Sequence, residues 1–199
     1  MILASLVRYY EALAAAGTLD RPGWSPVGVS YALELDEAGT LLQIIPLKIE
    51  QPQGKKTALR PQNLTVPSPI KRTVAILPNF LCDNSSYLLG VDNKGKPERS
   101  RDCFLAAQAL HIGLLENLTS PAAQAVRNFF SSWQSESAAE HPLVAGVWDD
   151  LSKGANLVFW VDGGYAHRDP QIQASWQRQY DSGPSEAAMQ CLITGERST

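Results

Sequence analysis

The chain has 199 residues, of which 44% are hydrophobic and 19% charged, and its formal net charge is −3. This composition is typical of a soluble globular chain that is long enough for one domain and its core. No run of about 18 apolar residues occurs, which excludes a spanning helix. The N-terminus has no basic leader before its apolar residues, which excludes a secretory signal.

The cysteines limit the chemistry further. Cys82, Cys103 and Cys191 are far apart and odd in number, and no C-x-x-C motif or Cys/His cluster occurs. This spacing argues against a disulfide framework and against a structural zinc site. We therefore predict reduced thiols, no bound metal and no cofactor, with Cys82 serving as a small buried hydrophobic residue.

The first half of the chain predicts a helix followed by strands. Apolar residues recur at spacings of three and four over residues 2–16, which indicates an amphipathic helix ended by Gly17. Residues 21–26 read as a turn-rich linker, residues 29–36 and 40–49 as a β-hairpin, and residues 51–56 as a flexible basic loop. Residues 59–66 predict a strand, and Pro61 within it favours an edge position.

The second half predicts mainly helices. Residues 86–91 read as a strand, turned by residues 92–96, and are followed by helices over 98–118, 121–133, 142–151 and 170–180. Ser120-Pro121 is a helix start, and His111 lies inside a helix where we expect a structural role. Late strands are predicted at 156–162 and 188–194. The predicted fold class is α+β: an N-terminal helix, an antiparallel hairpin or meander, a group of helices and a late strand pair.

Basic residues gather in the middle of the chain. Residues 48–101 contain ten basic and four acidic residues, a net charge of +6, whereas the remaining residues sum to −9. A basic middle in an acidic protein can attract a polyanion locally. The alternative is an ordinary solvated surface, because only clustering in space makes an electrostatic footprint.

Residues 71–90, KRTVAILPNFLCDNSSYLLG, group apolar residues with polar ones between them. Neither a helical period nor strict alternation fits the whole segment, so it reads as an ordered loop clamped by apolar anchors. Amides, hydroxyls and cationic side chains together suit phosphates and base edges. Asp-Asn-Ser-Ser is equally a common turn or helix-cap sequence, because these side chains bind their own backbone.

Catalytic motifs are absent from the sequence. It contains no Gly-rich phosphate loop, no G-x-S-x-G and no histidine-based metal motif. His111, His141 and His167 are scattered, and Asp149-Asp150 reads as the solvated face of a helix. We therefore predict no catalytic residue and no enzymatic activity.

The segment PNFLCDNSSYLLG, with the Asn-Lys-Gly-Lys turn at 93–96 and MILASLVRYYEAL at the N-terminus, resembles a known family. It is similar to the start of the large subunit of the type I-C CRISPR Cascade complex (CRISPR-associated protein, Dvulg subtype). The likeness continues in order through KRT, NLVFWVDG, Asp169-Pro170, Trp176 and CLITGE. Family members are longer, so residues 1–199 are expected to be one N-terminal domain truncated after Thr199, with a small helical subdomain at about 98–153.

The resemblance implies a non-catalytic, cytoplasmic DNA-binding domain in antiviral defence. Such a domain recognises the protospacer-adjacent motif in double-stranded target DNA and helps to start crRNA-guided strand separation, while base pairing reads the long target. The implied partners are that DNA, the crRNA-bound Cascade subunits and an anti-CRISPR inhibitor protein. Two other hypotheses stay open: a crRNA-processing endoribonuclease that uses one of the histidines, and a scaffold that docks Cascade subunits or an inhibitor.

The resemblance also suggests which residues contact DNA. Four short polar side chains are predicted to read base edges or the minor groove: Asn79, Asn84, Ser85 and Ser86. Six cations are predicted to hold phosphates: Lys71, Arg72, Lys94, Lys96, Arg99 and Arg101. Lys55 and Lys56 lie on the predicted loop and are expected to approach the duplex or the separated strand.

Overall fold

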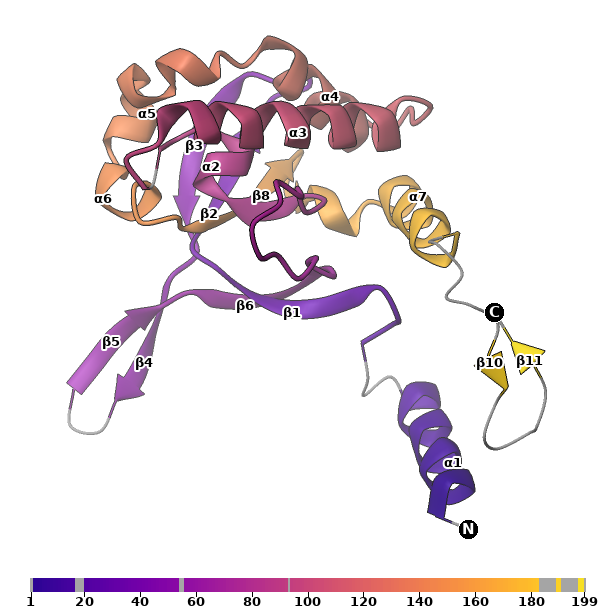
Figure 1. Cartoon of the computed structure of the whole chain (residues 1–199). Coiled ribbons are helices and arrows are strands. Elements are labelled where there is room, and N and C mark those ends of the chain that lie inside the picture. The colour runs from indigo at the N-terminus through magenta and orange to yellow at the C-terminus, as the bar shows by residue number, and fades with distance from the viewer. Residues whose placement is uncertain are drawn as a thin grey trace.

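A computed structural model describes residues 2–16, 20–53, 56–92, 94–182, 189–190 and 197–198 (Figure 1). Its main body has three layers. Helices cover one face of a central sheet, and a two-stranded ribbon covers the other face (Figure 1). The mixture of helices and strands confirms the predicted α+β class.

The central sheet has the strand order β3-β2-β8-β7. β2 (Tyr31–Leu35) and β3 (Leu41–Pro46) form the antiparallel hairpin predicted from the sequence. β8 (Asn156–Val161) confirms the late strand, and it pairs in parallel with β2 and antiparallel with β7 (Cys82–Asn84) and with β9 (Gly164–Tyr165). The parallel pair joins β2 and β8, which are more than 100 residues apart in the sequence, so no local sequence pattern predicts it.

Alternation along these strands produces two cores. Leu33 and Phe159 point toward the helices, whereas Ala32 and Val158 point toward the ribbon, as the period of two requires. All four side chains are completely buried. The sheet is therefore covered on both faces.

The ribbon consists of β1 (Trp24–Val29) and β6 (Gln62–Pro67), which pair antiparallel. The prediction of a turn-rich linker at 21–26 was therefore wrong over its second half. β4 (Ile49–Gln53) and β5 (Lys56–Arg60) form a second hairpin where a flexible loop was predicted, and Figure 1 shows it projecting from the body as an arm. Pro61 separates β5 from β6, so the predicted strand 59–66 is divided between two sheets.

The helices follow the sequence closely except at residues 85–88. α3 (Pro97–Leu115), α4 (Pro121–Ser132) and α7 (Pro170–Asp181) match their predicted spans. The predicted helix 142–151 is two short helices, α5 (Pro142–Ala145) and α6 (Trp148–Leu151), preceded by the 3₁₀ helix η1 (Ser135–Glu140). Residues 86–91 were wrongly predicted as a strand: α2 (Ser85–Leu88) begins there instead.

α1 (Ile2–Ala15) confirms the predicted N-terminal helix, and Figure 1 shows it standing apart from the main body. Its apolar side chains are largely exposed to solvent: Ile2 is 81% and Tyr9 63% exposed. The amphipathic pattern therefore predicts the helix correctly, but its apolar face has no cover in the described part of the chain.

The C-terminal region is described only in part. β10 (Met189–Gln190) pairs with β11 (Arg197–Ser198), while the rest of the predicted strand 188–194, including Cys191, lies outside the described residues. Among the described residues, no helix is long and apolar enough to span a membrane. The division into one domain over 1–199 with a helical subdomain at 98–153 stays a prediction.

Candidate nucleic-acid interface

Asp83 organises the loop over residues 71–90. Its side chain is 2% exposed and forms a two-pronged ion pair with the guanidinium of Arg72, with Nη1 at 2.9 Å from Oδ1. The backbone N–H groups of Asn79 and Asn84 also donate to this carboxylate. Burial raises the pKa of Asp83, and the bonds from Arg72 and the backbone oppose that rise. The carboxylate therefore ties the start of the loop, at Arg72, to its middle, at Asn79 and Asn84.

The loop is fixed to the helical layer by His111. His111 Nε2 accepts the N–H of Leu81 at 2.9 Å, and burial of the ring lowers the pKa of His111 to about 4. Leu81 has a positive φ of 59°, a conformation that costs a non-glycine residue about 1–3 kcal/mol. Because Leu81 and Phe80 are also buried, the predicted apolar clamp is confirmed, as is the structural role of His111.

The predicted base readers fall into two groups. Asn84 is half-buried and caps α2, since its Oδ1 accepts the N–H of Ser86 at 3.0 Å. Within the described part of the chain, no hydrogen bond involves Asn84 Nδ2, so this amide N–H₂ remains a donor. Ser85 Oγ and Ser86 Oγ donate to backbone carbonyls, and Asn79 Oδ1 accepts the N–H of Ile70.

Burial changes the role of three of these residues. Ser85 is 0%, Ser86 4% and Asn79 9% exposed. The hydroxyls of Ser85 and Ser86 and the Oδ1 of Asn79 already form hydrogen bonds within the protein, and all three residues are buried, so we remove them from the set of predicted base readers. These bonds hold the loop in shape. Asn79 Nδ2 and Asn84 Nδ2 both form no hydrogen bond with the described residues, and Asn84 is the more exposed of the two.

The turn that leads into α3 brings cations together. Asp92 Oδ1 accepts the backbone N–H groups of Lys94 and Lys96 at 3.0 Å each, and these bonds lower the pKa of Asp92. The side chains of Lys94, Lys96 and Arg99 are exposed, and Arg99 Nη2 donates to the carbonyl of Val74. The start of α3 adds the partial positive charge of a helix N-terminus.

One cavity joins this turn to the loop. It has a volume of about 130 Å³, and its lining includes six of the predicted site residues: Arg72, Asn84, Ser86, Lys94, Lys96 and Arg99. This is well below the roughly 300–1,000 Å³ of ordinary ligand pockets. We use the name α3 cradle for this cavity together with Asn84 and the three cations Lys94, Lys96 and Arg99. It suits a phosphate group and not a whole nucleotide.

Arg72 occupies the wall of the cradle, but its charge is already neutralised. Its Cζ lies 4.1 Å from the centroid of the Tyr87 ring, and its guanidinium is paired with Asp83. The remaining guanidinium N–H groups can still donate, but an ion-paired arginine adds little net positive field. Arg72 therefore supports the cradle more than it attracts a polyanion.

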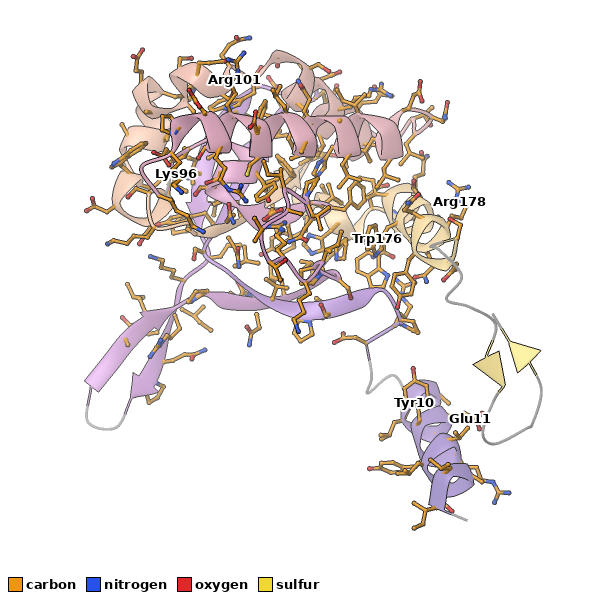
Figure 2. All side chains as sticks on the ribbon, in the orientation of Figure 1. Tyr10, Glu11, Lys96, Arg101, Trp176 and Arg178 are labelled. Atoms are coloured by element: carbon orange, nitrogen blue, oxygen red, sulfur yellow. The ribbon has the colours of Figure 1, made fainter. Side chains whose placement is uncertain are left out.

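The structure separates the other predicted phosphate contacts from the cradle. Arg101 forms an ion pair with Glu136 at 3.2 Å, and Figure 2 shows it above α3 whereas Lys96 lies below the start of the helix. Lys71 is exposed and does not line the cavity. Lys55 lies outside the described residues, and Lys56 begins β5 on the arm.

The sequence analysis missed a polar cluster at the base of the arm. Asp150, predicted to be a solvated helix residue, accepts from both the Tyr31 hydroxyl and Lys48 Nζ. Lys48 also lies 5.4 Å from the centroid of the Tyr31 ring. Burial and the bond to Asp150 raise the pKa of Tyr31 to about 12. These contacts fix the point from which β4 leaves the body, and no sequence spacing signals them.

The described side chains do not assemble a metal site or an exposed histidine cluster. No group of three or more His, Cys, Asp or Glu residues is placed to hold a metal ion in this part of the chain. His111 and His167 are buried, and His141 lies beside Trp133 with the ring centroids 5.2 Å apart and the rings tilted by 50°. Cys82 is buried as predicted, and burial raises the pKa of its thiol to about 12.

Comparison with known proteins supports the CRISPR-associated part of the resemblance noted in the sequence. A search among curated proteins found no match. A family model described as CRISPR-associated protein (Cas_Csd1) matches residues 6–199, which is nearly the whole chain. On that match, the chain belongs to the Cas_Csd1 family of CRISPR-associated proteins.

Proposed function

We propose that this chain is the N-terminal part of the large subunit of a type I-C Cascade complex, and that it recognises the protospacer-adjacent motif in double-stranded DNA. The family match supports a CRISPR-associated role, and the resemblance noted above supplies the finer identity. In this proposal the domain is cytoplasmic, works beside crRNA-bound subunits and cuts no nucleic acid. Its part is to engage the duplex so that crRNA-guided strand separation can start.

The observation that carries the proposal is the α3 cradle. Lys94, Lys96 and Arg99 surround a cavity of phosphate size at a helix N-terminus, where backbone dipoles also favour an anion. Asn84 Nδ2 lies at the same cavity with no partner in the described chain. Cations that bind phosphates position a protein on a duplex, and an amide donor beside them can read acceptors on base edges.

The test compares duplex binding by matched charge variants at low and moderate salt. Lys96→Gln should weaken binding to all sequences and reduce the slope of log K against log salt by about 0.9. Arg101→Gln is the control, because it removes the same charge from the other side of α3. Equal effects of the two variants would refute the cradle as the phosphate site.

Motif reading is tested separately at Asn84. Asn84→Ser keeps a side-chain oxygen able to cap α2 but removes the amide donor. We expect the preference for DNA with a T-rich flanking motif to be lost, while binding to duplexes without the motif is unchanged. An unaltered preference would exclude Asn84 as a reader.

The exposed apolar face of α1 favours a second function, docking of a partner subunit. Ile2, Leu6 and Tyr9 are all more than half exposed. Leu6→Glu should then reduce assembly with Cascade subunits without changing duplex binding. Loss of both would argue that α1 belongs to the DNA site.

The endoribonuclease alternative has less support. The imidazole of His111 already bonds to the loop backbone, and that of His167 is buried. Incubation with crRNA precursor should give no cleavage. Cleavage that depends on one of the three histidines would overturn the non-catalytic proposal.

A further inference from the structure

A second, larger hollow lies between the β1–β6 ribbon and η2 (Ala166–Arg168). Its volume is about 640 Å³, within the roughly 300–1,000 Å³ typical of ligand pockets. The neighbouring helix α7 contacts the far end of α3, where Ser175 Oγ donates to Leu114 O. A helix of 19 residues is about 28 Å long, so this hollow is well separated from the cradle at the N-terminus of α3.

Two arginines line the hollow, together with one carboxylate, Asp20, which accepts from Thr65 Oγ1 at 3.0 Å. Arg21 lies over the Trp24 ring, with its Cζ 5.3 Å from the centroid, and Arg168 lies over the Tyr165 ring at 4.9 Å. Both arginines are exposed, and neither forms an ion pair with a described residue. Arg21 Nη2 donates to Gln173 Oε1 at 3.1 Å. Stacking on an aromatic ring holds each guanidinium in place and leaves its other N–H groups for a phosphate.

Neutral polar groups lie between the arginines. The side-chain amides of Gln62 and Asn63 line the hollow and form no hydrogen bond with the described residues. His167 also lines it, and both of its ring nitrogens are buried without a partner in that part of the chain. The amides of Gln62 and Asn63 offer both donors and acceptors, as the edge of a nucleobase does.

We propose that this hollow binds one nucleotide of a single-stranded nucleic acid, with a phosphate between Arg21 and Arg168 and the base directed toward Gln62 and Asn63. The two arginines alone would suit any anion. The side-chain amides of Gln62 and Asn63, which form no hydrogen bond with the described residues, favour a ligand that carries donors and acceptors beside its charge. An unstacked base has these edges free, whereas bases in a duplex use them in pairing. The proposal goes beyond duplex recognition and does not depend on it.

The test measures fluorescence anisotropy of labelled single-stranded DNA and RNA of about ten nucleotides with the 199-residue chain. Arg168→Gln should weaken binding about tenfold and reduce the salt slope by about 0.7. Asn63→Ala should weaken it less and leave the slope unchanged. Arg178→Gln is the matched control, since this exposed arginine in the last turn of α7 does not line the hollow.

The outcomes are distinguishable from those for duplex binding. Lys96→Gln should leave single-strand binding unchanged, so failure of the cradle and failure of this hollow give different patterns. Equal effects of Arg168→Gln and Arg178→Gln would overturn the proposal, as would a lack of single-strand binding at low salt. Thermal unfolding of each variant verifies that a loss of binding is not a loss of folding.

Discussion

His111 links the stability of the fold to acid pH and to the loop at the candidate interface. Its ring is completely buried, with Nε2 accepting from Leu81 N and Nδ1 2.6 Å from Ala107 O. Both contacts are satisfied at once by the neutral tautomer that carries its proton on Nδ1. Protonation of Nε2 would set a donor against the Leu81 N–H and disrupt the bond that anchors the loop.

The size of the effect follows from the pKa of His111. Burial lowers it from 6.5 to about 4, so the unfolded chain binds the proton more tightly than the folded protein does. The stability due to the neutral ring is therefore fully present above pH 6.5 and is lost as the pH falls toward 4. At about 1.36 kcal/mol per pKa unit, the free energy of unfolding falls by about 2 kcal/mol between pH 7 and pH 5.

Urea unfolding of the wild type and of His111→Leu at pH 7 and pH 5 tests this reasoning. The variant should be less stable at pH 7 by about 2 kcal/mol, because the buried N–H of Leu81 loses its acceptor. Between pH 7 and pH 5, the free energy of unfolding of the variant should fall by about 2 kcal/mol less than that of the wild type. His167 is also buried and contributes in the same direction, so the difference between the two proteins is the decisive quantity. An equal pH dependence in both would refute the argument.

Three further substitutions test the contacts that hold the body together. Asp83→Asn should lower the free energy of unfolding by about 3 kcal/mol, because it leaves the half-buried Arg72 cation unpaired; a double variant with Arg72→Met should lose less than the sum of the single losses in urea. Ser120→Ala removes the cap of α4 and should cost about 1 kcal/mol by the same assay. Lys48→Met breaks a partly exposed pair with Asp150 and should change stability by less than about 1 kcal/mol in thermal unfolding.

The sequence predicted best what is determined locally. Ser120-Pro121 is a start signal within four residues, and the structure confirms both the helix and its cap, with Ser120 Oγ accepting from Ala123 N. The alternation of Tyr31, Leu33 and Leu35 likewise located β2, because every second residue of a strand lies on the same face, and these three share the core under the helices. Such signals depend on residues that are close in sequence, so they can be identified without knowledge of the tertiary structure.

The errors arise where distant segments decide the outcome. Residues 86–91 have an apolar run that suits a strand, but Asn84 caps a short helix there and Gly90 ends it with a φ of 76°. β1 contains Pro26 and Gly28, and it forms a strand because β6 supplies a partner some forty residues later. Propensity alone cannot anticipate a partner strand that is remote in sequence.

Helix geometry explains which of the predicted cations meet. Lys94, Lys96 and Arg99 gather because one short turn and the first turn of α3 place them on one side. Arg101 is two residues beyond Arg99, a rotation of about 200° around the helix axis, and so it faces away. Its ion pair with Glu136 follows from that orientation. A count of charges along the chain treats these residues as equivalent, whereas the helix period divides them.

Ion pairing also reduces the charge that a polyanion meets. Among the described basic residues between positions 48 and 101, Lys48, Arg72 and Arg101 are paired with carboxylates. The cradle offers three exposed cations with no such pair among the described residues: Lys94, Lys96 and Arg99.

Duplex binding through the cradle should therefore show a slope of log K against log salt of about −3, since each phosphate neutralised contributes about −0.9. All ten cations acting together would give a slope near −9. A titration of duplex affinity over salt concentration distinguishes the two, and Arg101→Gln should leave the slope unchanged. A slope near −9 would mean that the ion pairs open on binding and that the whole basic segment contacts the duplex. A slope near −3 would restrict the electrostatic contact to the start of α3.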